Sequence, residues 1–198
     1  MLGSDTYERI IAAALGCFLE NGVQSTTVEQ VRKRAEVSNG SFFHHFRTKQ
    51  DLAEAVYLQG LGRHQAELLA VLLPEAGLRA GVEGVVRRHL TWVEENPQLA
   101  AFLTAPPGWL APRDAPGITA RSREFFHTVA QWLRDRGWAG EPSLGVVIAV
   151  WMGPAHEYTR RWLLTGTEPP GSAATVLSRA AWNALQPLLP THASEDTR

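Results

Sequence analysis

Basic and small polar side chains gather in one short stretch of the sequence, residues 24–50. Five basic residues stand there against two acidic ones, a net charge of +3, and both lysines of the chain, Lys33 and Lys49, are among them. Cationic side chains neutralise nucleic-acid phosphates, and Asn, Ser and Thr form hydrogen bonds with base edges. The stretch therefore has the side chains of a nucleic-acid surface, although a run of charges alone also fits a solvated helix face.

Capping residues predict that the same stretch folds into short helices. Thr26 begins a capping box with the glutamate three positions later, Ser38 precedes a very short helix over residues 39–45, and Thr48 precedes a long helix from Lys49 to about Leu73. A helix, a tight turn and a second short helix form a unit that can enter a major groove. The N-termini of such helices also point N–H groups at phosphates.

The segment Val37 to Leu52, VSNGSFFHHFRTKQDL, resembles the DNA-binding motif of the tetracycline-repressor (TetR) family of transcriptional regulators. The upstream Phe18-x-x-x-Gly22 also stands where that family ends its first helix, and the resemblance covers residues 5 to about 58. It implies a DNA-binding head on a dimerising, effector-binding helical body. The positions that face DNA in the family correspond here to Thr27, Ser38, Asn39, Gly40, Ser41, Phe43, His44, His45 and Lys49.

The resemblance assigns these residues different roles on double-stranded DNA. Lys49 and His45 are expected to hold phosphates, and Asn39 and Ser41 to reach base edges, while Gly40 allows a close approach of the backbone.

Two residues depart from the family pattern. Phe43 replaces a common tyrosine, which removes a phosphate-bonding hydroxyl, and Asn39 stands where lysine is frequent. We expect Lys33, Arg34 and Arg47 to supply part of the missing phosphate attraction. The departures keep a second interpretation open, a helical ligand-binding or adaptor protein that has lost DNA binding.

Other constellations predict neither a metal site nor an enzyme. His44 and His45 are adjacent, so on a helix their side chains point about 100° apart. The segment from His156 to Arg160 lacks the second histidine of a zinc-binding HExxH motif. The chain has one cysteine, Cys17, and no acid, base and nucleophile at catalytic spacing. We expect no cofactor.

The elements that carry these residues are predicted to be helical throughout. The chain has 198 residues, a formal charge of −1 and 44% hydrophobic residues, and all twelve prolines lie at Pro74 or later. Apolar residues recur at helical spacing and no segment alternates as a strand does. We expect an all-α fold of about nine helices. The second helix follows the Thr26 cap and ends at Glu36-Val37. The predicted helices not yet described cover residues 5–20, 81–95, 97–103, 118–136, 143–165 and 173–189.

The sequence also predicts a division of the chain and a compartment. Residues 1–48 are expected to form the helix-turn-helix DNA-binding domain, residues 49–190 the helical effector-binding and dimerisation domain, and residues 191–198 a disordered tail. The longest apolar run, Leu144 to Met152, is too short for a membrane helix, and no signal peptide is recognisable, so we expect a cytoplasmic protein.

Aromatic residues of the body suggest a small-molecule site. All seven tryptophans lie outside the head, and the proline-rich loop from Thr104 to Ala120 is a candidate lid. An aromatic stripe at helical spacing also fits an ordinary core, so both interpretations stand. The candidate lining residues are Phe102, Trp109, Phe125, Phe126, Trp151, His156 and Tyr158.

The last two helices are apolar on more than one side, which predicts that one side packs on the body and another pairs with a second subunit. Val176, Ala180, Trp182 and Ala184 are the candidate interface residues. Together with the resemblance, this predicts a homodimeric repressor on a palindromic operator, released by an unidentified, small and largely apolar effector.

Overall fold

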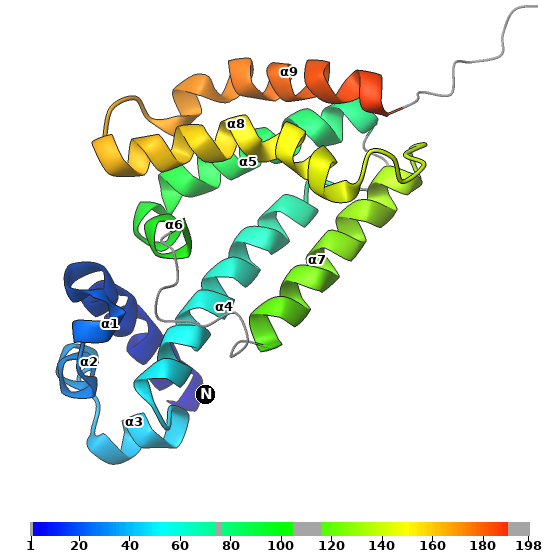
Figure 1. Ribbon diagram of the computed structural model, residues 1–198. Helices are drawn as coiled ribbons and strands as arrows, with labels where there is room; N and C mark the ends of the chain where they lie inside the picture. The colour runs from blue at the N-terminus through cyan, green and yellow to red at the C-terminus, as the bar shows by residue number, and fades with distance from the viewer. Residues whose placement is uncertain (1, 74–76, 105–115, 190–198) are drawn as a thin grey trace, which may run out of the picture. The chain divides into compact units, whose positions relative to one another are not determined.

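The computed structural model describes residues 2–73, 77–104 and 116–189. That part of the chain is all helical, with nine α-helices, two short 3₁₀ helices and no strand, as predicted (Figure 1). The elements are α1 (Leu2–Ser25), α2 (Val28–Ala35), α3 (Asn39–His45), α4 (Lys49–Leu69), α5 (Leu78–Glu95), α6 (Pro97–Thr104), α7 (Pro116–Arg134), α8 (Leu144–Thr165), η1 (Pro170–Ala173), α9 (Ala174–Leu185) and η2 (Gln186–Leu188).

The chain forms two compact units. The first comprises residues 1–63 and 98–121, and the second comprises residues 64–97 and 122–198. Helix α4 contributes its first part to one unit and its last turns to the other. The expected boundaries at residues 48 and 190 are drawn by function rather than by compactness, and they stay predictions.

Apolar side chains of α1 to α4 form the core of the first unit. Ile10, Val31, Phe42 and Leu52 are completely buried in it. The guanidinium of Arg9 on α1 donates hydrogen bonds to the carbonyl of Ala35, the last residue of α2, at 2.6 Å and to that of Glu36, its C-cap, at 3.1 Å. This contact closes the C-terminus of α2 and fixes its position on α1.

Helices α5, α8 and α9 lie side by side in the second unit and share its core with part of α7 (Figure 1). Leu90, Leu133 and Leu185 are completely buried there. The indole N–H of Trp151 donates to the carbonyl of Val82 at 2.9 Å, which ties α8 to α5 inside the core. None of the described helices combines the length and hydrophobicity that a membrane crossing requires.

Several predicted helix ends were wrong. The predicted stop of the first helix at Asn21-Gly22 is confirmed by the non-helical backbone of Gly22, where φ is 77°, although α1 resumes after this break and continues to Ser25. Helix α7 begins at Pro116, so the end of the predicted loop is helical, because proline is well suited to a first helical turn. Helix α9 stops at Leu185, since Pro187 cannot continue an α-helix and a 3₁₀ turn follows.

Candidate functional site

Helices α2 and α3 are joined by a three-residue turn, residues 36–38, which confirms the predicted helix, tight turn and helix. The capping box of α2 differs from the prediction. Thr27, not Thr26, is the N-cap: its hydroxyl oxygen accepts from the Gln30 N–H at 3.2 Å, and the Gln30 side chain accepts from the Thr27 N–H at 2.7 Å. Thr26 is buried and donates its hydroxyl to the carbonyl of Cys17, so the neighbouring threonine is left to cap.

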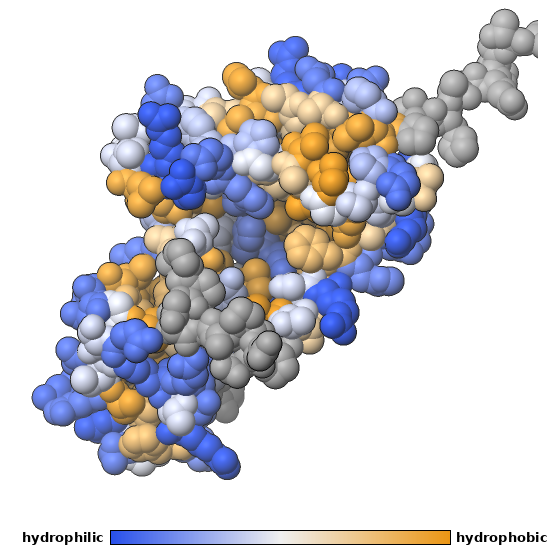
Figure 2. All heavy atoms as spheres, in the orientation of Figure 1, coloured by the Kyte–Doolittle hydropathy of each residue, from blue (hydrophilic) through white to orange (hydrophobic). Residues whose placement is uncertain are grey.

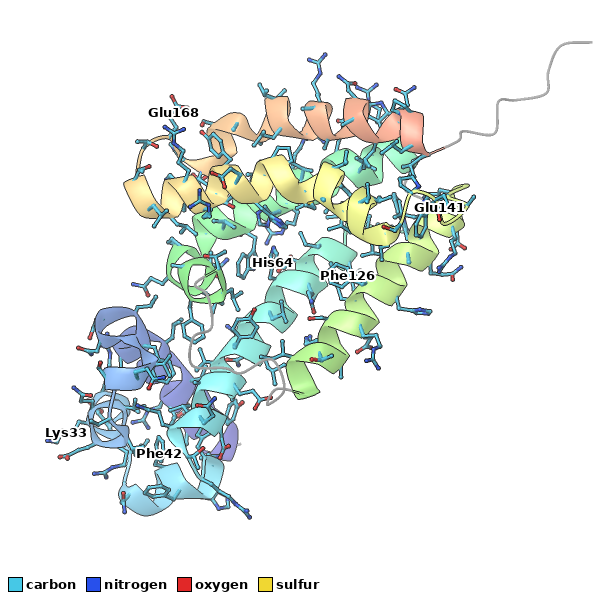
Figure 3. The ribbon with its side chains drawn as sticks, in the orientation of Figure 1. Lys33, Phe42, His64, Phe126, Glu141 and Glu168 are labelled. Carbon is cyan, nitrogen blue, oxygen red and sulfur yellow. The ribbon has the colours of Figure 1, made fainter. Side chains whose placement is uncertain are left out.

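Helix α3 presents one apolar and one polar side. Ser38 caps it as predicted, since its hydroxyl accepts from the N–H of Ser41 at 3.1 Å. Phe42 is completely buried and points into the first unit (Figure 3), whereas the neighbouring Phe43 is 47% exposed. Asn39, Gly40 and His44 are also exposed, and Ser41 and His45 are half-buried. The outer side of α3 therefore combines small polar groups with one bare aromatic ring.

The two adjacent histidines contact rings rather than a common ligand. His45 lies edge-on to Tyr7 of α1, with ring centroids 5.9 Å apart, and edge-on to His44 at 5.2 Å. Within the described residues no group of three His, Cys, Asp or Glu side chains is arranged to hold a metal ion.

The start of α4 lies beside the C-terminal end of α1. Thr48 caps α4 as predicted, with a reciprocal pair of hydrogen bonds to Asp51 at 3.0 and 3.1 Å. The Lys49 ammonium donates to the carbonyl of Gln24 at 2.5 Å. Lys49 is therefore held at the C-terminal end of α1, the helix that precedes α2.

Basic residues of α2 are partly neutralised by acidic neighbours. Lys33, which projects outward in Figure 3, pairs with Glu29 at 2.8 Å, and the Lys33 ammonium lowers the pKa of the Glu29 carboxyl. Arg34 pairs with Glu20 of α1 at 2.6 Å. Arg32 and Arg47, by contrast, have no ion-pair partner among the described residues.

The candidate ligand residues do not all lie in one unit. Phe102 belongs to the first unit, where its ring stacks on Phe18 at 5.9 Å and meets Tyr57 edge-on at 6.3 Å. Trp109, with most of the proposed lid, lies outside the described residues. The structure thus assigns Phe102 to the core of the helix-turn-helix unit.

The other candidates belong to the second unit. Phe125 is half-buried against its core, and Phe126 is 39% exposed, with the two ring centroids 5.3 Å apart. Trp151 is fully buried. The Tyr158 hydroxyl lies 3.4 Å from a carboxylate oxygen of Glu168, in the connection that follows α8. Trp151 therefore belongs to the core, Phe126 lies at the surface, and Tyr158 contacts the connection between α8 and α9.

His156 lies beside a group of polar residues that the sequence did not predict to meet, His64, His89 and Thr159. Its ring lies edge-on to His89 of α5, with the centroids 4.8 Å apart. The Nδ1 atom of His89 is 3.0 Å from Nε2 of His64 on α4 (labelled in Figure 3), and its Nε2 atom is 3.4 Å from the hydroxyl of Thr159 on α8. The Trp92 ring lies 4.5 Å from that of His64. The only available signal was a histidine on each of three helices, which does not indicate that they meet.

The histidines of this group are held in the neutral form. Burial, followed by the nearby His156 and Arg88, lowers the pKa of His64 to about 4. Burial, followed by His156 and His64, lowers the pKa of His89 to about 2. Both imidazoles are therefore uncharged at neutral pH, with one N–H donor and one bare nitrogen acceptor each.

The candidate dimer residues follow the outer side of α9. Val176 is 70% exposed, Ala180 and Ala184 are exposed one and two turns later, and Figure 2 shows hydrophobic patches over α8 and α9 among hydrophilic residues. Trp182 is half-buried against the core and lies beneath the Arg79 guanidinium, 6.0 Å from its ring centroid. Three of the four candidates are therefore accessible.

Comparison with known sequences places the helix-turn-helix unit among regulators. Residues 10–56 match the sequence profile of the bacterial regulatory proteins of the tetR family. The chain is 36% identical over 91 residues to the transposon Tn10 TetC protein of Escherichia coli, which covers 46% of each chain. It is 34% identical over 98 residues to the uncharacterized HTH-type transcriptional regulator TtgW of Pseudomonas putida, a match that covers 50% of this chain and 69% of TtgW.

The sequence matches are partial, whereas the fold matches extend further. The chain spans about half the length of TetC, and 44% of the regulator SrpR of Pseudomonas putida. A tetR-family regulatory protein from Rhodococcus RHA1 superposes with a TM-score of 0.75 at 19% identity, over 94% of this chain and 97% of that one. FadR from Bacillus subtilis, solved in complex with stearoyl-CoA, gives a TM-score of 0.76 at 16% identity, over 88% and 97%. These likenesses establish the helical fold over nearly the whole chain.

Proposed function

The chain belongs to the TetR family of bacterial transcriptional regulators, and from this premise we propose that it is a homodimeric, sequence-specific DNA-binding repressor that an apolar small molecule releases from its operator. The observation that carries the proposal is the exposed outer side of α3. That side has hydrogen-bonding groups and one apolar ring on a helix seven residues long, short enough to enter a major groove end-on.

The proposed DNA contacts combine positioning and base recognition. His45, the last residue of α3, and Lys49, the first residue of α4, hold phosphates. The N-terminus of α2, capped by Thr27, offers further N–H groups to the DNA backbone. Asn39 and Ser41 contact base edges. The phosphate contacts then fix the position of the protein along the DNA duplex, and the base contacts of α3 give the sequence preference.

The proposed dimer forms through the outer sides of α8 and α9. Val176, Ala180 and Ala184 are spaced four residues apart, so they line one side of α9 and leave little bulk between two packed helices. A two-fold dimer places two recognition helices about 34–36 Å apart, one turn of DNA, and therefore requires a palindromic operator.

The proposed effector binds in the helical body and favours a state that no longer fits DNA. A ligand shifts such an equilibrium only by binding one state more tightly than the other. The complex of FadR with stearoyl-CoA supports the idea that a body of this fold accepts a largely apolar ligand.

The test begins with selection of bound sequences from a random DNA pool by the full chain. Fluorescence anisotropy then measures affinity for the selected sequence at several salt concentrations, with random DNA as competitor. We expect a palindromic sequence, two subunits per site, and a preference of at least about a thousandfold over random DNA.

A failed selection would favour a different function for the same fold. If selected and random DNA compete equally, the head has lost sequence recognition, and a ligand-binding or adaptor role follows. Phe43, Asn39 and the ion pairs of Lys33 and Arg34 are the features that favour this second candidate, because each weakens attraction to DNA.

A further inference from the structure

A polar chain crosses three helices inside the second unit. It runs from His64 of α4 through His89 of α5 to Thr159 of α8, and the last two residues are 5% and 2% exposed. Polar groups in such a position cost stability unless each has a partner, and hydrophobic residues of similar size are usually at least as stable there. We therefore expect this series of hydrogen-bonded side chains to have a role beyond packing.

The hydrogen bonds of Thr159 determine which atom donates in each of the other hydrogen bonds of this series. Its hydroxyl oxygen lies 3.0 Å from the carbonyl oxygens of Ala155 and His156, which only accept, so the hydroxyl proton is directed to them. The hydroxyl then accepts from Nε2–H of His89. This leaves Nδ1 of the neutral His89 without a proton, and Nε2 of His64 must donate to it.

The last acceptor of this hydrogen-bonded series, Nδ1 of His64, accepts no hydrogen bond from a described residue. Neutral His64 carries its proton on Nε2, so its Nδ1 has a free lone pair, and no described residue donates to that atom. Every buried side-chain nitrogen and oxygen among the described residues has a hydrogen-bond partner. Nδ1 of His64 is therefore not completely buried, and the indole of Trp92 beside the imidazole supplies an apolar surface.

We propose that Nδ1 of His64 accepts a hydrogen bond from the effector, and that the effector is an apolar molecule with a neutral hydroxyl group, a phenol or an alcohol. This inference rests on the proposed function, since it identifies the chemical class of the molecule that the body binds. A carboxylate does not fit the same atom, because two lone pairs repel unless His64 takes up a proton, and its low pKa opposes that protonation.

The first test determines the proton positions in the full-length protein. Two-bond ¹H–¹⁵N spectra of histidine-labelled protein distinguish the two neutral tautomers. We expect both His64 and His89 to carry the proton on Nε2. A proton on Nδ1 of His64 would overturn the proposal, because that nitrogen would then be a donor.

The second test compares two probes that differ only in the donor, 4-propylphenol and its methyl ether. We expect the phenol to bind roughly three- to tenfold more tightly and to shift the His64 Nδ1 resonance, which the ether leaves in place. Equal affinities, or tighter binding of 4-propylbenzoate with uptake of a proton, would contradict a neutral hydroxyl.

A matched variant isolates the acceptor. In His64→Gln the amide nitrogen takes the place of Nε2 and keeps the donor to His89, but no acceptor replaces Nδ1. We expect this variant to bind phenol and ether alike, while His127→Gln, at an exposed position of α7, keeps the preference. An unchanged preference in His64→Gln would place the hydroxyl elsewhere.

These measurements contain no DNA, so they separate the two proposals. Discrimination at His64 without operator binding would contradict the repressor and leave the hydroxyl site standing. Operator binding without discrimination would contradict the hydroxyl site alone. If both hold, 4-propylphenol should weaken operator binding in the native protein and not in His64→Gln.

Discussion

Lys49 is the residue whose charge can be tested most directly on DNA. We expect Lys49→Ala to weaken binding to selected and random DNA alike and to lower the slope of log affinity against log salt by roughly one unit, since one phosphate contact is lost. Anisotropy titrations at four salt concentrations measure the slope. Arg123→Ala, which removes an exposed charge of the second unit, is the control. A slope unaffected by Lys49→Ala would mean that its bond to Gln24 is its whole role.

Phe43 offers the complementary test of a missing group. We expect Phe43→Tyr to tighten binding about two- to tenfold for every DNA sequence, because the restored hydroxyl can donate to a phosphate. The salt slope should stay the same, as no charge is added. Phe43→Leu keeps an apolar side chain without the hydroxyl and serves as the control. Tightening confined to the selected operator would show that the ring lies against a base instead.

Residue-level prediction succeeded where the chemistry is local in sequence. Ser38 and Thr48 were identified as caps because a cap and the N–H groups it accepts from lie within three residues. The group of His64, His89 and Thr159 was not identified, because its members are 25 and 70 residues apart and meet only through packing. The candidate DNA and ligand contacts themselves stay predictions.

At the scale of helices, the caps of α2 and α3 have a measurable role. We expect Thr27→Ala to lower the free energy of unfolding by about 1 kcal/mol, because the hydroxyl acceptor for the Gln30 N–H is lost. Urea denaturation followed by circular dichroism gives the value. Thr27→Ser retains the hydroxyl and should unfold as the native protein does. Equal destabilisation by both variants would point to the lost methyl group.

Helix number and type were predictable, and helix ends were less so. Periodic apolar residues and the clustering of prolines after residue 73 decided the all-helical fold. The capping box was misplaced by one residue because Thr26 and Thr27 are adjacent and equally suitable, and only the burial of Thr26 decides between them. Sequence alone also gave no reason to join residues 98–121 to the first unit, which depends on contacts such as Phe102 with Phe18.

At the scale of the whole molecule, the buried histidines predict a pH-dependent stability. Their pKa values lie below the value of about 6.5 in an unfolded chain, so the unfolded state takes up protons first as the pH falls. The contribution of the neutral histidines to the free energy of unfolding is therefore fully present above pH 6.5. It decreases below that pH by up to about 1.4 kcal/mol per histidine for each pH unit. Urea unfolding at pH 7.0 and 5.5 measures the loss.

A variant separates this effect from general acid sensitivity. His89→Leu should flatten the pH dependence, since His89 no longer titrates, whereas the exposed His127→Gln should keep it. Parallel curves for the native protein and His89→Leu would assign the acid loss to other groups.

The proposed dimer can be tested by charge placed on α9. We expect the double change Val176→Asp and Ala180→Asp to convert the dimer to a monomer, because four buried carboxylates would face one another across a two-fold interface. Sedimentation equilibrium gives the mass. Ala120→Asp, at an exposed position of α7, should remain dimeric. A dimer that survives the α9 changes would move the interface to another surface.

The ion pairs of Lys33 with Glu29 and of Arg34 with Glu20 also bear on how the protein distributes itself inside a cell. A chromosome offers millions of non-specific DNA sites, and a regulator with many unpaired cations spends most of its time bound to such sites. Here two cations of the head already pair with its own carboxylates, which would weaken attraction of the proposed repressor to non-specific DNA. A larger share of its molecules would then stay unbound, and fewer copies would be needed to occupy the proposed operator.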